Sequence, residues 1–240
     1  MRLWLWLGIV ACNGTAAPPV KPLDATPPPS VPGGPTAQVF PSGRDVPVNG
    51  LRFRLLWSEA MELGPHAIEV RDAHGRTVPG AVREVTWDDG FRACAIRPEG
   101  LTPTAQYSLH VEGVTSGRGI VNAPFDHTFV LRPEDTTAPS AKALTVAGVP
   151  KAGGREPIVF TFPEAMDADG VGAVSVLAGG ALVTGRWTFA DGESVWTFDP
   201  DGAWPAGRVL ISLGAGIRDL AGNELADREA GMFPPARPAK

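Results

Sequence analysis

The sequence predicts an all-β protein that carries two β-sandwich domains in tandem, and three observations lead to this prediction. Several motifs recur after about a hundred residues, which is the size of one sandwich domain. Within each copy, apolar residues alternate with polar residues at every second position, as they do in half-buried strands. Turns rich in Gly and Pro separate these runs, and no stretch carries a sustained helical stripe of apolar residues.

Three motifs of the first copy recur in the second copy in the same order. The matched segments are Trp57–Glu62 with Phe162–Asp167, Trp87–Gly90 with Phe189–Gly192, and Ile96–Pro98 with Phe198–Pro200. This alignment matches Cys94 with Trp196. The polar, Pro-bounded junction Pro133–Pro139 separates the copies, so we expect one domain over residues 36–134 and a second over residues 138–240.

The spacing of apolar residues indicates the type of sandwich. Leu55 and Trp57 face one side of a predicted strand while Arg54 faces the other, and residues 107–112 and 209–213 alternate in the same way. About seven short strands per copy, joined by Gly and Pro turns, are typical of an immunoglobulin-like β-sandwich.

Each copy also resembles the bacterial immunoglobulin-like domains of surface and S-layer-associated proteins. The resemblance rests on the aromatic-x-Glu-Ala-Met-acidic motif, the Asp-Gly hairpin before an x-Pro corner, and the late element Asp219–Asn223. It covers roughly residues 36–132 and 138–235. The first copy has Val114–Gly119 in place of Asp-x-x-Gly-Asn, so we expect a differently built last hairpin there. The resemblance implies a sandwich fold and a spacer or adhesive context, without a single activity.

The N-terminus has the order of a bacterial lipoprotein leader. Arg2 precedes the apolar run Leu3–Val10, and the small residue Ala11 precedes Cys12, which is the order of a secretory signal peptide. The placement of Cys12 resembles a lipobox, so we expect a signal peptide over residues 1–11, cleavage between Ala11 and Cys12, and lipid attachment at Cys12. A plain secretory signal with a chance Cys is the alternative. The leader predicts a lipid-anchored protein of the cell envelope, at the outer membrane, in the periplasm or facing the surface.

Residues 12–35 are rich in Pro and poor in large apolar residues. Such a segment buries too little surface to fold, so we expect a disordered tether. In polyproline II geometry, at about 3.1 Å per residue, it would hold a domain roughly 60–70 Å from a membrane.

The second cysteine and the four histidines predict no reactive centre. Once Cys12 is acylated, Cys94 has no partner for a disulfide, and its inward phase predicts a buried, inert thiol. The four histidines, which we interpret as surface or loop residues, are scattered as His66, His74, His110 and His127. The aromatics expected to fill the cores are Trp57, Trp87, Trp187 and Trp196.

Enzyme signatures are missing from the sequence. It has no G-x-S-x-G elbow, no phosphate-binding loop with Lys, and no H-E-x-x-H or C-x-x-C metal spacing. The acidic pairs Glu59/Glu62 and Glu164/Asp167 could supply the two carboxylates of a glycosidase, but they recur as part of the domain motif, so fold topology explains them. We therefore expect no enzyme, no cofactor and no resident metal.

Two functions from different classes remain open. The first is a non-enzymatic spacer, scaffold or adhesive unit with a protein or glycan partner. The second is a ligand-binding lipoprotein that recognises a glycan or small molecule, with Trp187 and Trp204 as candidates for a sugar platform. Because the formal net charge is −5 and both signs are interspersed, we expect no nucleic acid partner. Calcium could assist the second function through a set of acidic and amide oxygens: Glu164, Asp167, Asp169, Asp219 and Asn223.

Overall fold

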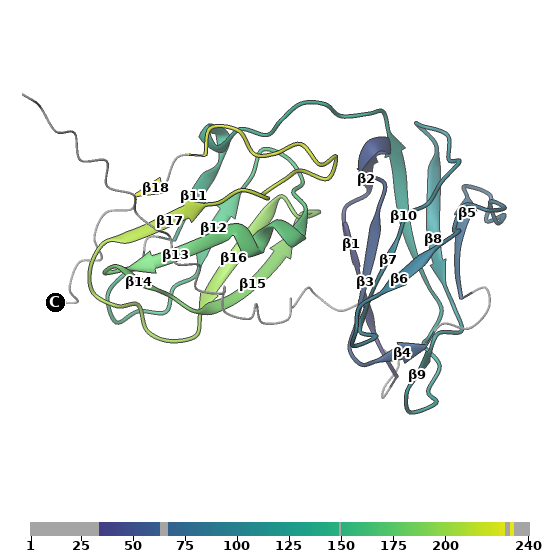
Figure 1. Cartoon of the computed structure of the whole chain (residues 1–240), viewed down its shortest axis with the longest axis horizontal. Coiled ribbons are helices and arrows are strands. Elements are labelled where there is room, and N and C mark those ends of the chain that lie inside the picture. Colours follow the sequence, from purple (N-terminus) through teal and green to yellow (C-terminus); the bar gives the residue numbers. More distant parts are fainter. Residues whose placement is uncertain (1–33, 63–66, 149, 229–230, 233–240) are drawn as a thin grey trace, which may run out of the picture.

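In the computed structural model, two β-sandwiches lie side by side along the long axis of the molecule (Figure 1). The structure describes residues 34–62, 67–148, 150–228 and 231–232. The leader with Ala11 and Cys12, the tether over residues 12–33, and His66 lie outside the described residues. Helical structure in the described part is limited to three short 3-10 helices, η1 (Val48–Gly50), η2 (Ala141–Ala143) and η3 (Ala168–Ala173).

The first sandwich is built from two four-stranded sheets and a small strand pair. One sheet has the order β1-β3-β7-β6, with β1 (Ala37–Phe40), β3 (Phe53–Trp57), β7 (Ala93–Ile96) and β6 (Val85–Trp87). The other has the order β2-β10-β8-β5, with β2 (Asp45–Pro47), β10 (Phe125–Arg132), β8 (Gln106–Val111) and β5 (Ile68–Asp72). Strands β4 (Met61–Glu62) and β9 (Thr115–Ser116) pair at the end of this sandwich that lies away from the second sandwich (Figure 1).

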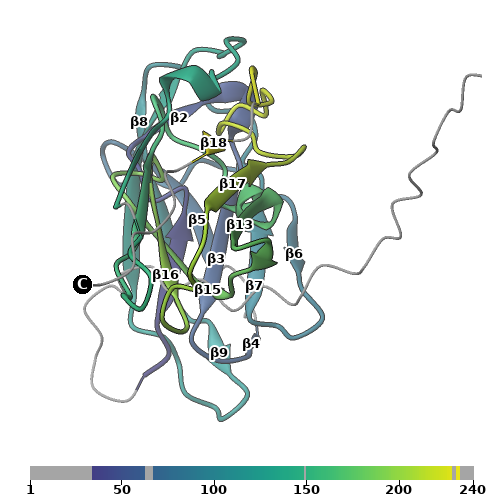
Figure 2. The ribbon, with the colours of Figure 1, turned by 90° about the vertical axis from the view of Figure 1, so that its left-hand side faces the viewer.

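The second sandwich has the same two-sheet plan, and Figure 2 shows it from the end. One sheet has the order β11-β12-β16-β15, with β11 (Thr145–Ala147), β12 (Ile158–Thr161), β16 (Val195–Pro200) and β15 (Gly185–Ala190). The other has the order β14-β13-β17-β18, with β14 (Ala181–Leu182), β13 (Val174–Ala178), β17 (Val209–Leu213) and β18 (Gly231–Met232). The predicted fold class of tandem immunoglobulin-like sandwiches is therefore confirmed.

Each sandwich encloses a core formed by the inward phase of its strands. Phe53, Leu55 and Trp57 of β3 are buried in the first core together with Phe129 of β10. The second core is richer in large aromatics and contains Phe160, Phe162, Trp187, Trp196, Phe198 and Trp204. Because successive side chains of a strand point to opposite faces, the observed alternation places these residues between the sheets.

Strand register shows that the sequence repeat is also a structural repeat. Leu55 pairs with Cys94 between β3 and β7, and Phe160 pairs with Trp196 between β12 and β16. The prediction that Cys94 occupies the position of Trp196 is thus confirmed. Cys94 is 2% exposed, and burial raises the pKa of its thiol to about 12, so the thiol stays protonated.

The last hairpins of the two sandwiches have the same backbone conformation, so the expectation that the first is built differently is wrong. The amide of Ser116 donates to the carbonyl of Ile120 at 2.8 Å, and the amide of Asp219 donates to that of Asn223 at 3.1 Å. Ser116 pairs with Met61, and Asp219 bridges to Met166 in the same antiparallel sense. In the first hairpin the Ser116 hydroxyl accepts the amide of Ile120, and in the second the Asp219 carboxylate accepts the equivalent amide of Asn223. The sequence motif therefore differs between the two copies, but the turn is the same.

His110 is buried and His127 is half-buried, contrary to the prediction that all four histidines lie on the surface or in loops. His110 lies on β8, whose neighbours are β10 and β5, so side chains of both strands cover it. Its ring nitrogens lie 2.9 Å from the Asp126 carboxylate and 3.1 Å from that of Glu112. His127 shares the inward phase of β10 with Phe129, and burial lowers its pKa.

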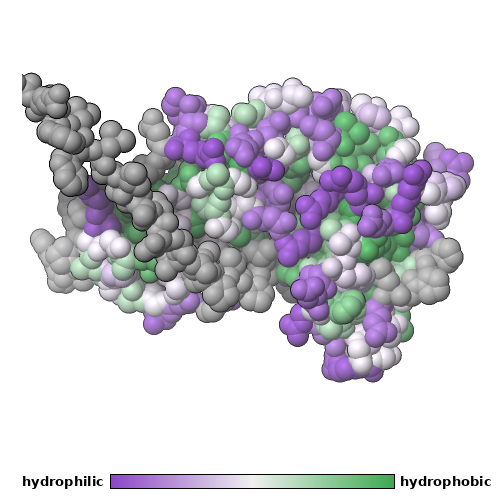
Figure 3. Space-filling view, in the orientation of Figure 1, coloured by the Kyte–Doolittle hydropathy of each residue, from purple (hydrophilic) through white to green (hydrophobic). Residues whose placement is uncertain are grey.

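Among the described residues, no helix combines the length and the apolar character needed to cross a bilayer. Figure 3 shows hydrophilic and hydrophobic residues mixed over the visible face of both sandwiches.

Candidate functional site

The first sandwich contributes an aromatic side chain to the core of the second. Phe40, the last residue of β1, is buried within the second core and meets Phe189 edge to ring at 6.2 Å between centroids. Leu56, which points outward from β3, packs against the same core. The two sandwiches therefore share apolar surface, and the free energy of burying Phe40 depends on their contact.

A buried carboxylate reinforces this contact. The Glu193 side chain accepts the amide of Ser42, with 2.9 Å and 3.0 Å between the nitrogen and the two oxygens. Glu193 is 1% exposed, and burial raises its pKa, while the amides of Ser42 and Gly43 oppose that rise. This buried hydrogen bond joins the two sandwiches and favours one relative orientation.

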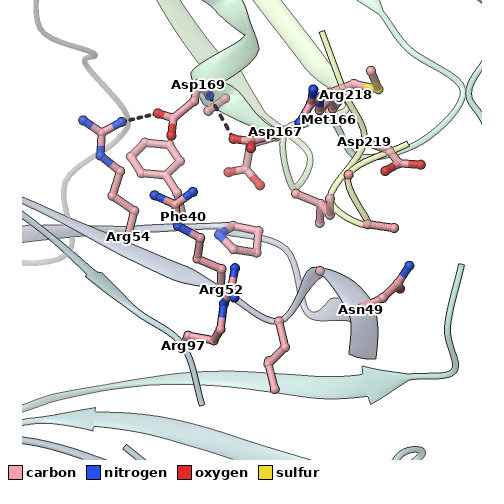
Figure 4. A pocket seen from close by; sticks show the side chains of 18 of the residues that line it. Phe40, Asn49, Arg52, Arg54, Arg97, Met166, Asp167, Asp169, Arg218 and Asp219 are labelled. Carbon is pink, nitrogen blue, oxygen red and sulfur yellow. Dashed lines mark hydrogen bonds and ion pairs between the residues drawn. The ribbon is translucent and has the colours of Figure 1, made fainter. Parts of the chain in front are cut away.

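The backbones of the two sandwiches approach so closely that only Gly fits at two points. A Cβ atom on Gly50 would lie 1.8 Å from the carbonyl oxygen of Leu220. A Cβ atom on Gly192 would lie 2.9 Å from the Cα atom of Gly43. Arg54 of β3 also forms an ion pair with Asp169 of η3 (Figure 4).

The linker between the sandwiches is held by side-chain amides from both of them. The Asn49 amide of η1 donates to the carbonyl of Asp135 at 2.7 Å. The Asn223 amide donates to the carbonyls of Asp135 at 3.1 Å and Thr137 at 3.3 Å. The junction therefore has specific hydrogen-bond partners on each side.

A cleft of about 490 Å³ lies between the two sandwiches. Figure 4 shows Arg52, Arg54 and Arg97 along one wall and Asp167 and Asp169 across from them. The remaining wall comes from the Phe40 segment, η1 and the last hairpin of the second sandwich. The volume is in the range of clefts that bind small molecules, and its lining is strongly charged.

Three carboxylates meet beside this cleft. Oxygen atoms of Asp135, Glu164 and Asp219 lie within 4.8 Å of one another, and Asp219 is 2% exposed. Burial raises the pKa of Glu164, and the carboxylates of Asp219 and Asp135 raise it further. The cluster therefore favours the uptake of positive charge, whether a proton or a cation.

The calcium candidates are brought together only in part. Glu164 and Asp219 meet, but Asp167 and Asp169 do not belong to the cluster, since Asp169 pairs with Arg54 and Asp167 caps η3. The Asn223 amide directs its nitrogen toward Asp219 and donates a hydrogen bond at 2.8 Å. With one oxygen from each carboxylate, the cluster offers three of the six to eight oxygens that Ca²⁺ usually takes, and Asn223 already donates to the Asp219 carboxylate.

The other predicted acidic site is neutralised within its own domain. Glu59 forms a two-pronged ion pair with Arg118, with nitrogen–oxygen distances of 2.7 Å and 2.6 Å. The Arg118 guanidinium lowers the pKa of Glu59, chiefly through these hydrogen bonds. A general acid needs a raised pKa, so Glu59 is unsuited to that role.

The proposed sugar platform is not formed, because both of its aromatics are buried. Trp204 is 2% exposed, and its indole N–H donates to the carbonyl of Glu156 at 2.8 Å. Trp187 packs against Phe160, Trp196 and Phe198 in the second core. Trp187 points into the sandwich from β15, and Trp204 is buried in the same core from the connection between β16 and β17, so neither ring offers a surface for stacking sugars.

Four residues of this region are not predicted as site residues from the sequence: Asp135, Glu193, Arg52 and Arg97. Asp135 stands in the linker and reaches the second sandwich only through the folded junction. The pairing of Arg52 with Arg97 could have been predicted from the sequence, because each residue flanks a core strand and the two positions become neighbours once β3 pairs with β7.

Comparisons with known proteins give structural similarities at low identity. No protein-family description and no curated protein matches the sequence. The titin Z1Z2 domains, solved with telethonin, are 15% identical over 75% of this chain and 89% of titin's, with a TM-score of 0.25. A fragment of Escherichia coli α2-macroglobulin is 15% identical over 72% of this chain, with a TM-score of 0.27, and this chain spans 65% of its length. Murine CEACAM1b is 13% identical over 85% and 98% of the two chains, with a TM-score of 0.20. These scores are too low to carry a functional argument, so the fold rests on the strands and sheets described above.

Proposed function

We propose that this protein is a non-enzymatic, lipid-anchored component of the bacterial cell envelope. Its two immunoglobulin-like sandwiches act as a spacer or scaffold that holds a protein-binding surface away from the membrane. The interface between the sandwiches carries this proposal. Phe40, Glu193 and the Gly50 contact favour one relative orientation, which suits a unit that sets distance and direction.

The anchor is proposed from the leader. Acyl chains on Cys12 would contribute about 0.8 kcal/mol per buried methylene, and two chains suffice for stable attachment. The Pro-rich tether would then separate the rigid body from the bilayer, consistent with the resemblance to surface-associated domains.

The experiment compares three forms of the protein expressed with labelled palmitate: the full chain, Cys12→Ala, and a chain begun at residue 36 behind a cleavable secretory signal. We expect palmitate label on the full chain alone and unprocessed precursor for Cys12→Ala. The full chain should partition into detergent, and the chain begun at residue 36 should stay in the aqueous phase. Equal partitioning of all three forms into the aqueous phase, or a mature N-terminus other than Cys12, would overturn the anchor and leave a freely secreted protein.

A further inference from the structure

The cleft between the sandwiches holds two arginines without a carboxylate partner. Across the described residues, neither Arg52 nor Arg97 has a hydrogen bond or an ion pair, while the third arginine of this wall, Arg54, pairs with Asp169. Both side chains are exposed and line the cleft. Arg52 acts on Asp167 only through space, where it lowers the pKa against the larger effect of burial.

Strand register places these two arginines next to each other on neighbouring strands. Phe53 pairs with Ile96 and Arg54 with Ala95, so the ladder continued by one residue sets Arg52 opposite Arg97. Side chains directly opposite on neighbouring strands have Cβ atoms about 5 Å apart, and like charges in this arrangement repel. An anion between them would replace this repulsion by two attractive contacts.

The fold itself does not require this pair. In the structural repeat, Pro157 stands at the position of Arg52 and Asp199 at that of Arg97, so the second sandwich forms the same ladder without them. The charged groups around the pair are already satisfied. Glu193 accepts the Ser42 amide, and Glu99 is within 3.4 Å of Arg83.

We infer that the cleft between the sandwiches is a binding site for a small anionic ligand, whose acid group is held between Arg52 and Arg97. Guanidinium groups bind carboxylate, sulfate and phosphate through paired hydrogen bonds, which gives direction as well as attraction. The cleft volume of about 490 Å³ admits a small molecule or the end of a polymer and excludes a folded domain. Asp167 and Asp169 on the opposite wall offer acceptors for hydroxyl groups of the same ligand. The inference goes beyond the spacer function and does not depend on the lipid anchor.

The experiment measures binding to the full mature protein in detergent by calorimetry and by NMR titration. The probes are inorganic phosphate and D-glucuronate, with D-glucose as the neutral counterpart of the second probe. The variants are Arg52→Gln and Arg97→Gln. Arg155→Gln is the matched control, because Arg155 is an exposed arginine of the second sandwich outside the cleft.

We expect saturable binding of at least one anion, no binding of glucose, and about a tenfold or larger loss of affinity in each cleft variant. Arg155→Gln should bind as the parent protein does. Because each substitution also removes the repulsion between Arg52 and Arg97, both cleft variants should unfold at or above the parent temperature without ligand, which excludes misfolding as the cause.

Binding of phosphate alone would assign a phosphate-type ligand, and binding of glucuronate alone would assign a carboxylate ligand. No binding of either anion at millimolar concentration, equal binding of glucose, or unchanged affinity in both cleft variants would overturn the inference. Failure of the anchor experiment would leave this result untouched.

Discussion

The last hairpins of the two sandwiches have the same backbone and opposite electrostatics. In the first sandwich, Arg118 neutralises Glu59; in the second, Ala221 stands at the position of Arg118, and Glu164 instead meets Asp135 and Asp219. The second hairpin has no arginine at this position, and the Asn223 side chain donates a hydrogen bond to Asp219 in this cluster. The comparison teaches that the repeat conserves hydrogen-bonded turns, while the charges around them are set by what each hairpin faces.

The neighbouring hairpins differ for the same reason. Phe91 and Glu193 occupy equivalent positions, because their carbonyls accept the amides of Met61 and Met166 respectively. Phe91 is 53% exposed at the free end of the first sandwich, whereas Glu193 is 1% exposed because the first sandwich covers it. A second domain thus converts an exposed turn into a buried contact.

The largest expected difference lies in the cores. Trp196→Ala should lower the free energy of unfolding by about 3–5 kcal/mol, because a large buried ring leaves a cavity. Cys94→Ala at the equivalent position should lower it by only about 1–2 kcal/mol, since one buried sulfur is removed. Denaturant unfolding of both variants checks this pair, and equal losses would contradict the view that the second core depends more on its aromatics.

The hairpin amide gives the next largest effect. Asn223→Ala should lower the free energy of unfolding by about 1–3 kcal/mol, because it removes the side-chain donor to the buried Asp219 carboxylate and to the linker carbonyls of Asp135 and Thr137. Ile120→Ala at the equivalent exposed position should change it by less than about 0.5 kcal/mol. Urea titration of the two variants makes the comparison. A loss for Ile120→Ala as large as that for Asn223→Ala would show that the turn, rather than the buried carboxylate, controls stability.

The two equivalent glutamates should give small effects of opposite sign. The pKa of Glu164 is raised in the folded chain. The contribution of Glu164 to folding stability is therefore fully present below the unfolded pKa and is lost as pH rises through the folded pKa. At pH values above the folded pKa of Glu164, Glu164→Gln should therefore stabilise the protein by under about 1 kcal/mol. In acid, where Glu164 is protonated in both states, the variant and the parent should be equally stable.

The pKa of Glu59 is lowered, so its contribution is present above the unfolded pKa and is lost as pH falls through the folded pKa. Glu59→Gln should slightly destabilise the protein at neutral pH, and this difference should also vanish in acid. Melting temperatures of both variants across the acidic range test the signs. The same sign for both variants at neutral pH would show that Arg118 does not separate the two sites.

Much of the fold could be predicted because alternation and repeat spacing are local properties of the sequence. The match of Cys94 with Trp196 follows directly from aligned motifs, and the strand register confirms it. The burial of His110 could not be predicted, because it depends on β8 being an inner strand of its sheet.

The site was harder to predict, because its residues converge only when the two sandwiches meet. Phe40 reads as an ordinary residue of the first sandwich, yet it fills the second core. Glu193 follows an Asp-Gly turn and would ordinarily face solvent. The alternation of apolar and polar residues shows which side of a strand is covered, but it does not show which domain covers that side.

If the two sandwiches form one body of fixed orientation, the distance between a point on each of them should have a single value. Spin labels at Ala73→Cys and Lys151→Cys, in a chain begun at residue 36, place one probe on an exposed position of each sandwich. The buried Cys94 thiol, with its pKa near 12, should stay unlabelled. Pulsed electron paramagnetic resonance should give one narrow distance distribution, which broadens in Gly50→Ala because a Cβ atom there meets the Leu220 carbonyl. A broad distribution in the parent chain, unchanged by Gly50→Ala, would contradict the account.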